Sequence, residues 1–200
     1  MGVCMAARRV WVRFSGICGI MAPLVAFTLI LFAIASYPQF SWTENALSDL
    51  GVVEGFTSAT FNSGLIAGGV LALIFAVGLF RFQTKAAGRV GALIFVLAAL
   101  SLTGIGVFPE NVRPIHYYVS VAFFALSPIA LLVLCVAFVQ ARQVKMGWFT
   151  FSVALFAAAV WVFHWTVGFG ANVAIPEALS ALAASVWAVM VGYEMLKERL

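Results

Sequence analysis

Long apolar stretches alternate with short polar connections along the whole chain. Each stretch has about 20 residues, the length that an α-helix needs to cross about 30 Å of hydrocarbon. This pattern predicts an all-α, polytopic integral membrane protein whose single domain, residues 1–200, is a compact bundle of six transmembrane helices. The predicted spans cover residues 16–36, 60–80, 88–107, 116–140, 147–168 and 174–196.

The basic residues lie on alternate connections between these spans. Of the eleven Lys and Arg residues, Arg113 alone falls on the opposite side from the others. Positive charge is retained on the cytoplasmic side during insertion, so both termini of this multi-pass cell-membrane protein are expected to be cytoplasmic. The ten residues that define the cytoplasmic side are Arg8, Arg9, Arg13, Arg81, Lys85, Arg89, Arg142, Lys145, Lys197 and Arg199.

Composition excludes a water-soluble protein. With 64% hydrophobic and 9% charged residues, the chain has too little polar surface to cover a soluble globule of 200 residues. A net charge of +4 in a soluble protein would suggest nucleic acid, but here the charge lies beside the membrane. It therefore favours anionic lipid headgroups, and membrane lipids rather than nucleic acid are the expected partners.

The first outer connection, residues 37–59, is the longest and contains no basic residue. Thr43 is a suitable N-cap, and Gly51 can end a helix in a left-handed conformation. The connection is therefore predicted to contain a short helix, residues 44–50, that caps the outer ends of the spans.

Gly64 and Gly68 form a small-xxx-small pair in the second span. Such pairs let helix backbones approach closely where lipid supplies no hydrophobic drive. Their face could pack inside the bundle, or it could contact another protein if this chain is a subunit of a larger complex.

Polar residues that could carry chemistry collect at the outer ends of the spans. The two histidines of the chain, His116 and His164, lie at about the same depth on adjacent spans. Ionisable groups near hydrocarbon normally point into the bundle or into a wet cavity, which predicts a polar pocket open to the outside. The candidate pocket residues are Asn45, Ser48, Asp49, Glu110, Arg113, His116, Ser120, His164 and Glu177.

Two kinds of metal chemistry fit this residue set. His116 and His164 could bind zinc together with Asp49 or Glu177, leaving one carboxylate as a general base for metal-assisted hydrolysis. Ser48 would then orient the substrate or act as the nucleophile. Alternatively, the two histidines could ligate haem axially. In the first scheme Asn45, Glu110, Arg113 and Ser120 would bind the ligand.

Structural roles are also open for these residues. Glu177 follows Pro176 at the start of a predicted helix, where the helix dipole alone favours a carboxylate. Asp49 could serve only to hydrogen-bond its own loop. Arg113 could be a clamp that pairs with Glu110 or Asp49.

Two segments resemble a prokaryotic membrane-protein family catalogued as domain of unknown function 998. The first runs from Thr43 to Gly51 and has an N-x-x-S-x-L-G-like pattern; the second is a G-x-F-P segment followed by His116 and by Phe123-Phe124. The resemblance implies a six-span layout with a long first outer loop. It draws attention to Asn45, Ser48, Asp49, Gly51, Phe108, Pro109 and His116, and it implies no particular activity.

The sequence thus predicts a protein that binds a lipid or a small polar-headed molecule in a pocket at the outer leaflet. Whether it also hydrolyses that molecule is left open. One alternative is a non-catalytic accessory subunit of a larger membrane-protein complex. A haem-binding membrane protein is the third.

Overall fold

A computed structural model describes the backbone of residues 2–197 and the side chains of residues 7–197, so that Arg199 lies outside the described residues. Within the described part the chain has no strand, and the predicted all-α fold is confirmed. Its elements are α1 (Gly2–Ala35), the 3₁₀ helix η1 (Leu47–Val52), α2 (Phe56–Phe82), α3 (Ala86–Val107), α4 (Ile115–Gln140), α5 (Val144–Thr166) and α6 (Ala174–Leu196).

All six α-helices are long and apolar enough to cross a membrane. A helix satisfies its backbone hydrogen bonds internally, which is what a segment surrounded by lipid requires. Two helices extend well past the apolar stretches in the sequence: α1 begins at Gly2 and α2 at Phe56. The chain is therefore a multi-pass helical membrane protein.

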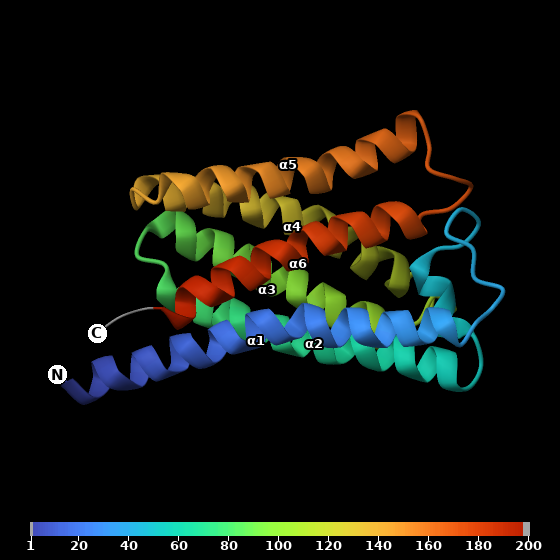
Figure 1. The fold of residues 1–200 in the computed structure, drawn as a ribbon, viewed down its shortest axis with the longest axis horizontal. Helices are drawn as coiled ribbons and strands as arrows, with labels where there is room; N and C mark the ends of the chain where they lie inside the picture. The colour runs from blue at the N-terminus through green and yellow to red at the C-terminus, as the bar shows by residue number, and fades with distance from the viewer. Residues whose placement is uncertain (1, 198–200) are drawn as a thin grey trace.

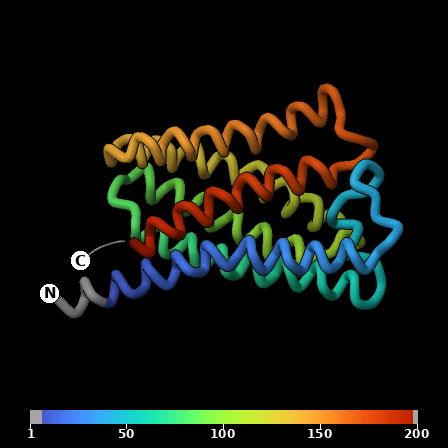
Figure 2. The backbone as a smooth tube through the Cα atoms, viewed as in Figure 1, coloured from blue at the N-terminus to red at the C-terminus, as the bar shows by residue number. Residues whose placement is uncertain are grey.

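Each helix packs against the next in chain order and α6 returns to pack against α1, so the helices form a closed ring. The helices run along the length of the bundle (Figures 1 and 2). The ring has two unlike ends. The loop end carries the connections 36–55, 108–114 and 167–173, and the basic end carries the short connections 83–85 and 141–143. The start of α1 and the finish of α6 both lie at the basic end.

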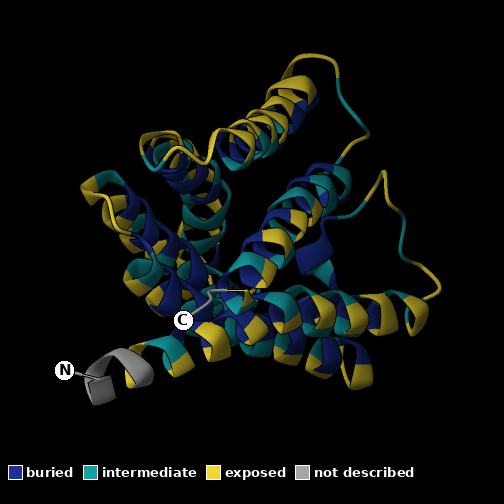
Figure 3. Cartoon of the chain, turned by 60° about the vertical axis from the view of Figure 1, so that its left-hand side comes forward, coloured by how far each residue is buried: buried dark blue, intermediate teal, exposed yellow. Residues whose placement is uncertain are grey.

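An aromatic cluster occupies the interior of the ring. Exposed residues lie on the outer faces of the helices (Figure 3), and many of them are large and apolar. The Trp187 ring is completely buried and lies 5.4 Å from the Phe95 ring and 6.0 Å from the Phe75 ring, measured between centroids. Its Nε1 atom donates a hydrogen bond of 3.0 Å to Thr150 Oγ1, so the buried indole N–H is satisfied. This cluster joins α2, α3, α5 and α6.

The small residues of α2 are used inside the chain. A Cβ atom on Gly64 would lie 2.8 Å from Leu29 Cβ, and one on Gly68 would lie 2.8 Å from Ala26 Cβ. The α1 backbone therefore fills this face. The prediction that the Gly64/Gly68 face could contact another subunit is wrong, because α1 already occupies it.

Glycines also bring α1 against α6. A Cβ atom on Gly16 would lie 2.7 Å from the Gly192 carbonyl oxygen, and one on Gly192 would lie 2.6 Å from the Gly16 carbonyl oxygen. The two backbones approach so closely that neither position has room for a side chain. This contact closes the ring between the first and last helices.

Gly68→Val is expected to destabilise the fold by about 1–3 kcal/mol, because the added side chain forces α1 away from α2. The midpoint of thermal unfolding in detergent should fall clearly below that of the parent. Ser63→Val adds a β-branched residue at an exposed position of the same helix and should leave the midpoint nearly unchanged. Equal midpoints for the two variants would contradict the tight contact between α1 and α2.

Candidate functional site

The short helix of the first connection begins later than predicted. It is the 3₁₀ helix η1, with Ala46 as its N-cap residue, whereas the sequence predicted a helix over 44–50 that starts after Thr43. The Asp49 carboxylate explains the difference, because its Oδ2 atom accepts from the Ala46 backbone N–H at 3.1 Å and from Asn45 Nδ2 at 2.8 Å. Asn45 and Asp49 thus fix the start of η1.

The residues before η1 are attached to the start of α6. The Thr43 carbonyl oxygen accepts from the Ala171 N–H at 2.7 Å, and the Asn45 carbonyl oxygen accepts from the Ala174 N–H at 3.0 Å. The second bond gives an acceptor to the Ala174 N–H, which has none within the helix because it lies in the first turn of α6. Because its carbonyl serves this purpose, Thr43 belongs to the loop and does not cap η1.

Glu177 completes this attachment. Its Oε2 atom accepts a hydrogen bond of 2.7 Å from the Leu47 backbone N–H, and the residue is buried. The carboxylate lies in the first turn of α6, where the helix dipole also favours a negative charge. Glu177 therefore connects η1 directly to α6.

The apolar side of η1 packs into the loop end of the ring. Leu50 is fully buried and Leu47 nearly so, and both belong to a cluster with Phe61, Leu65 and residues of α1, α3 and α6. The Gly51 carbonyl oxygen accepts from Asn62 Nδ2 at 2.9 Å, which ties η1 to α2. With its apolar side held in this way, η1 presents Ser48 toward the third connection.

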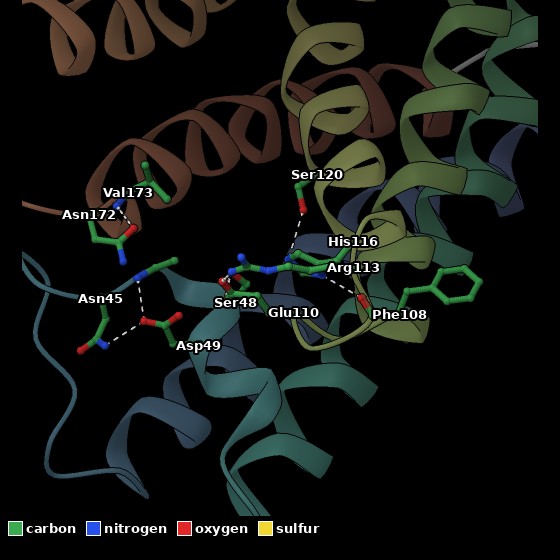
Figure 4. A network of polar contacts seen from close by, with 11 residues as sticks. Asn45, Ser48, Asp49, Phe108, Glu110, Arg113, His116, Ser120, Asn172 and Val173 are labelled. Carbon is green, nitrogen blue, oxygen red and sulfur yellow. Dashed lines mark hydrogen bonds and ion pairs between the residues drawn. The ribbon is translucent and has the colours of Figure 1, made fainter.

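Glu110 is the centre of a polar contact network in that connection (Figure 4). Its Oε2 atom accepts from Ser48 Oγ at 3.3 Å, and its Oε1 atom pairs with Arg113 at 3.2 Å. Burial and the nearby Asp49 carboxylate raise the pKa of Glu110, and this outweighs the opposing effects of Arg113 and His116. The protonated form of Glu110 is favoured relative to a glutamate in water.

Both ring nitrogens of His116 have partners (Figure 4). Nδ1 lies 2.7 Å from the Phe108 carbonyl oxygen, and Nε2 lies 3.3 Å from Ser120 Oγ. Because a carbonyl oxygen only accepts, Nδ1 is the donor, and Nε2 of the neutral ring accepts from the Ser120 hydroxyl. The Phe108 carbonyl thereby fixes both the tautomer and the orientation of the ring.

These groups line one end of a cavity of about 1040 Å³ between α4, α5 and α6. The cavity is polar at the loop end and becomes apolar as it runs deeper along α4 and α5. Its polar end is lined by Ser48, Glu110, Arg113, His116, Ser120, Asn172 and Glu177. Its apolar part is lined by Val121, Phe124, Ala125, Pro128, Ile129, Ala158 and Trp161.

The residues proposed from sequence fall into three groups. Those that line the cavity are Ser48, Glu110, Arg113, His116, Ser120 and Glu177. Asn45 and Asp49 lie outside this lining and hold η1 in place.

His164 forms the third group, since it is absent from the cavity lining. It is buried among aromatic rings, with Phe169 stacked at 6.3 Å between centroids and Trp165 at 4.9 Å. Its Nδ1 atom has no hydrogen-bond partner in the part of the chain that the structure describes.

The arrangement does not supply the predicted zinc ligands. Within the described residues no three His, Cys, Asp or Glu side chains are grouped as a metal ion would require. His116 already uses both ring nitrogens, and His164 is absent from the lining of the cavity that His116 faces. For the same reasons, His116 and His164 do not face one another across the cavity as a pair of axial haem ligands would.

The apolar half of the cavity is what sequence reasoning missed. Trp161 contributes its ring to the wall and donates from Nε1 to Ser180 Oγ at 3.2 Å. Ala158, Trp161 and Trp165 recur on α5 at intervals of three and four residues, the spacing of one helix face. That spacing was readable in the sequence, but nothing local distinguishes a face that lines a cavity from one that faces lipid.

A family model described as protein of unknown function (DUF998) matches residues 20–194. The match extends from within α1 into the last turns of α6 and so includes the whole cavity. No curated protein and no solved structure gives a significant match.

The raised pKa of Glu110 makes stability depend on pH. The pKa is higher in the folded protein than the usual value of about 4.3, so the contribution to stability is fully present below about pH 4. It is lost as the pH rises through the raised pKa. The midpoint of thermal unfolding should therefore fall as the pH rises above about 4, and it should fall less in Glu110→Gln, which cannot ionise.

Glu54→Gln is the control, because it removes an exposed carboxylate of the first connection. In this variant the unfolding midpoint should change with pH as steeply as it does in the parent. Identical slopes in the parent and in Glu110→Gln would contradict the assignment of this pH dependence to Glu110.

Proposed function

This chain belongs to the DUF998 family, and from the geometry of its cavity we propose that it binds a lipid or other single-chain amphiphile. The observation that carries the proposal is the change from a polar to an apolar lining within one cavity of about 1040 Å³. This volume is at the upper end of the range for small-molecule sites, about 300–1000 Å³. A polar head would occupy the loop end and an apolar chain the space between α4 and α5.

The exposure of the wall supports entry of the ligand from the bilayer. Tyr117, Val121 and Ile129 line the cavity and are also 64%, 48% and 46% exposed. They follow one another at intervals of four or eight residues along α4, so they form one continuous stripe. In a membrane this stripe faces hydrocarbon, which suits a ligand that arrives sideways from the lipid phase.

The polar end favours a head that donates hydrogen bonds. Glu110 and Glu177 contribute carboxylates, whereas Arg113 is the one cation of the lining and is already paired with Glu110. A hydroxyl- or amine-bearing head would find hydrogen-bond acceptors here, whereas an anionic head would find no unpaired cation in the lining. We therefore favour a neutral or cationic head.

The charge pattern supports placing this cavity in the outer leaflet. Ten of the eleven Lys and Arg residues flank the basic end of the ring in the sequence. If that end is cytoplasmic, both termini are cytoplasmic, and the loop end with its cavity faces outward.

Filling the apolar part of the cavity should weaken amphiphile binding. Ala158→Phe introduces a ring into the wall and should weaken binding of a brominated monoacylglycerol by about tenfold or more. Bromine quenches tryptophan fluorescence on contact, and Trp161 and Trp165 supply the signal from the lining.

Ala159→Phe is the matched control, because Ala159 is also exposed on α5 but does not line the cavity. Its affinity should stay within about twofold of the parent. Equal weakening by both variants, or no saturable quenching in the parent, would overturn the proposal.

Ester hydrolysis is a second candidate function, and one specific contact favours it. Ser120 Oγ lies 3.3 Å from His116 Nε2, while Nδ1 of the same ring is held by the Phe108 carbonyl. A serine beside a base that a third group orients is the arrangement of an activated nucleophile. Ser120 Oγ would attack an acyl carbonyl as His116 takes its proton and passes it to the leaving alcohol. Water would then release the acid and restore Ser120.

Ser120→Ala should reduce hydrolysis of p-nitrophenyl dodecanoate by about a hundredfold or more, because the attacking oxygen is lost. Binding of the brominated monoacylglycerol should persist in this variant. Ser127→Ala is the control, since Ser127 donates to the Phe123 carbonyl on the same helix and does not line the cavity. Hydrolysis by the parent that survives in Ser120→Ala would refute the nucleophile.

A further inference from the structure

A second cavity, of about 760 Å³, lies at the basic end of the ring. It is bounded by the final turns of α2, α4 and α6 and by the first turn of α5. Its floor contains the buried side chains of Phe138 and Val191, and its mouth carries Arg142, Lys145 and Lys197. This cavity shares no lining residue with the cavity at the loop end.

The mouth of this cavity is positively charged. Glu194 supplies the one carboxylate of the lining, and it pairs with Lys197 at 3.0 Å. Among residues 7–197 no carboxylate lies within ion-pair distance of Arg142 or Lys145. Within these residues, Arg142 and Lys145 thus have no carboxylate partner.

Arg142 occupies a position where glycine would be the simpler residue. Its φ angle is 60°, in the left-handed region. Its N–H bonds to the Val139 carbonyl at 2.9 Å, and the Gln143 N–H bonds to the Phe138 carbonyl at 2.8 Å. This is the hydrogen-bond pair of a Schellman motif, whose left-handed residue is usually glycine because a Cβ atom is unfavourable there. The turn thus holds a guanidinium at the cavity mouth at some conformational cost.

Exposed aromatic residues lie close to the cavity along the chain. Trp148 on α5 and Tyr193 on α6 are 65% and 50% exposed, close in sequence to the lining residues Lys145 and Glu194. Exposed Trp and Tyr side chains of membrane helices concentrate at the interface between hydrocarbon and water. A cationic mouth beside such residues is therefore within reach of lipid phosphates.

We propose that the cavity at the basic end binds the phosphate group of an anionic phospholipid. The Arg142 guanidinium and the Lys145 ammonium pair with the phosphate oxygens. The acyl chains begin along Phe138 and Val191 and continue into the surrounding bilayer. This site is independent of the function proposed for the cavity at the loop end.

The test is a titration of the full-length protein in uncharged detergent, with bound lipid counted by native mass spectrometry. The probes are phosphatidylglycerol and phosphatidylcholine with identical acyl chains. One phosphatidylglycerol per chain should bind more tightly than phosphatidylcholine, and Arg142→Gln/Lys145→Gln should weaken it by about tenfold or more. Lys85→Gln/Arg89→Gln is the matched control, because it removes the same charge from the same end but outside the cavity.

The control variant should bind phosphatidylglycerol within about twofold of the parent. Equal weakening in the two double variants would overturn the proposal, since it would show a diffuse effect of surface charge. No preference for phosphatidylglycerol over phosphatidylcholine in the parent would overturn it as well. If inorganic phosphate displaced phosphatidylglycerol at similar concentrations, the phosphate site would stand, but its ligand would be free phosphate and not a lipid.

Arg142→Gly separates the role of the side chain from that of the turn. Glycine suits the left-handed conformation, so the midpoint of thermal unfolding should be no lower than that of the parent. Binding of phosphatidylglycerol should nevertheless weaken, because the guanidinium is lost. Unchanged binding in this variant would remove Arg142 from the site.

Discussion

The hydrogen bond between the Leu47 backbone N–H and the buried Glu177 carboxylate is the contact on which the loop end depends. It joins the first connection to the last helix, across 130 positions of the chain. With the bonds that Thr43 and Asn45 accept, it holds η1 against the start of α6. A buried carboxylate or N–H without its partner is strongly unfavourable, so each of these groups keeps the other in place. The polar end of the cavity exists because η1 is fixed there.

The cavity also depends on how unevenly the ring is packed. Around α1 the contacts are made by glycines, which let backbones approach until no side chain fits between them. On the opposite side, the contact between α4 and α5 toward the loop end is made by aromatic rings, and Phe124 and Trp161 lie 4.9 Å apart between centroids. Both of these residues line the cavity. The same helical architecture is thus closed on one side and hollow on the other.

The fold could be predicted from sequence because each span satisfies its own backbone and must be apolar along its length. The polar end of the cavity could also be predicted, since polar side chains at a common depth in the membrane are oriented toward the bundle or a wet cavity rather than toward lipid. The start of η1 could not be predicted, because it depends on which N–H group donates to the Thr43 carbonyl oxygen, and that donor lies in the connection before α6. His164 failed as a pocket residue for a related reason. Depth follows from position along a span, but the direction in which α5 turns its faces is set by its neighbours.

The two cavities present opposite chemistry at opposite ends of one bundle. The lining at the loop end has carboxylates, a histidine acceptor and a single Arg that is already paired. The lining at the basic end has three cations and one paired carboxylate. In the proposed scheme a ligand with an anionic head suits the second cavity, and one whose head donates hydrogen bonds suits the first. The charge asymmetry that orients a membrane protein during insertion would then also give its two ends preferences for different headgroups.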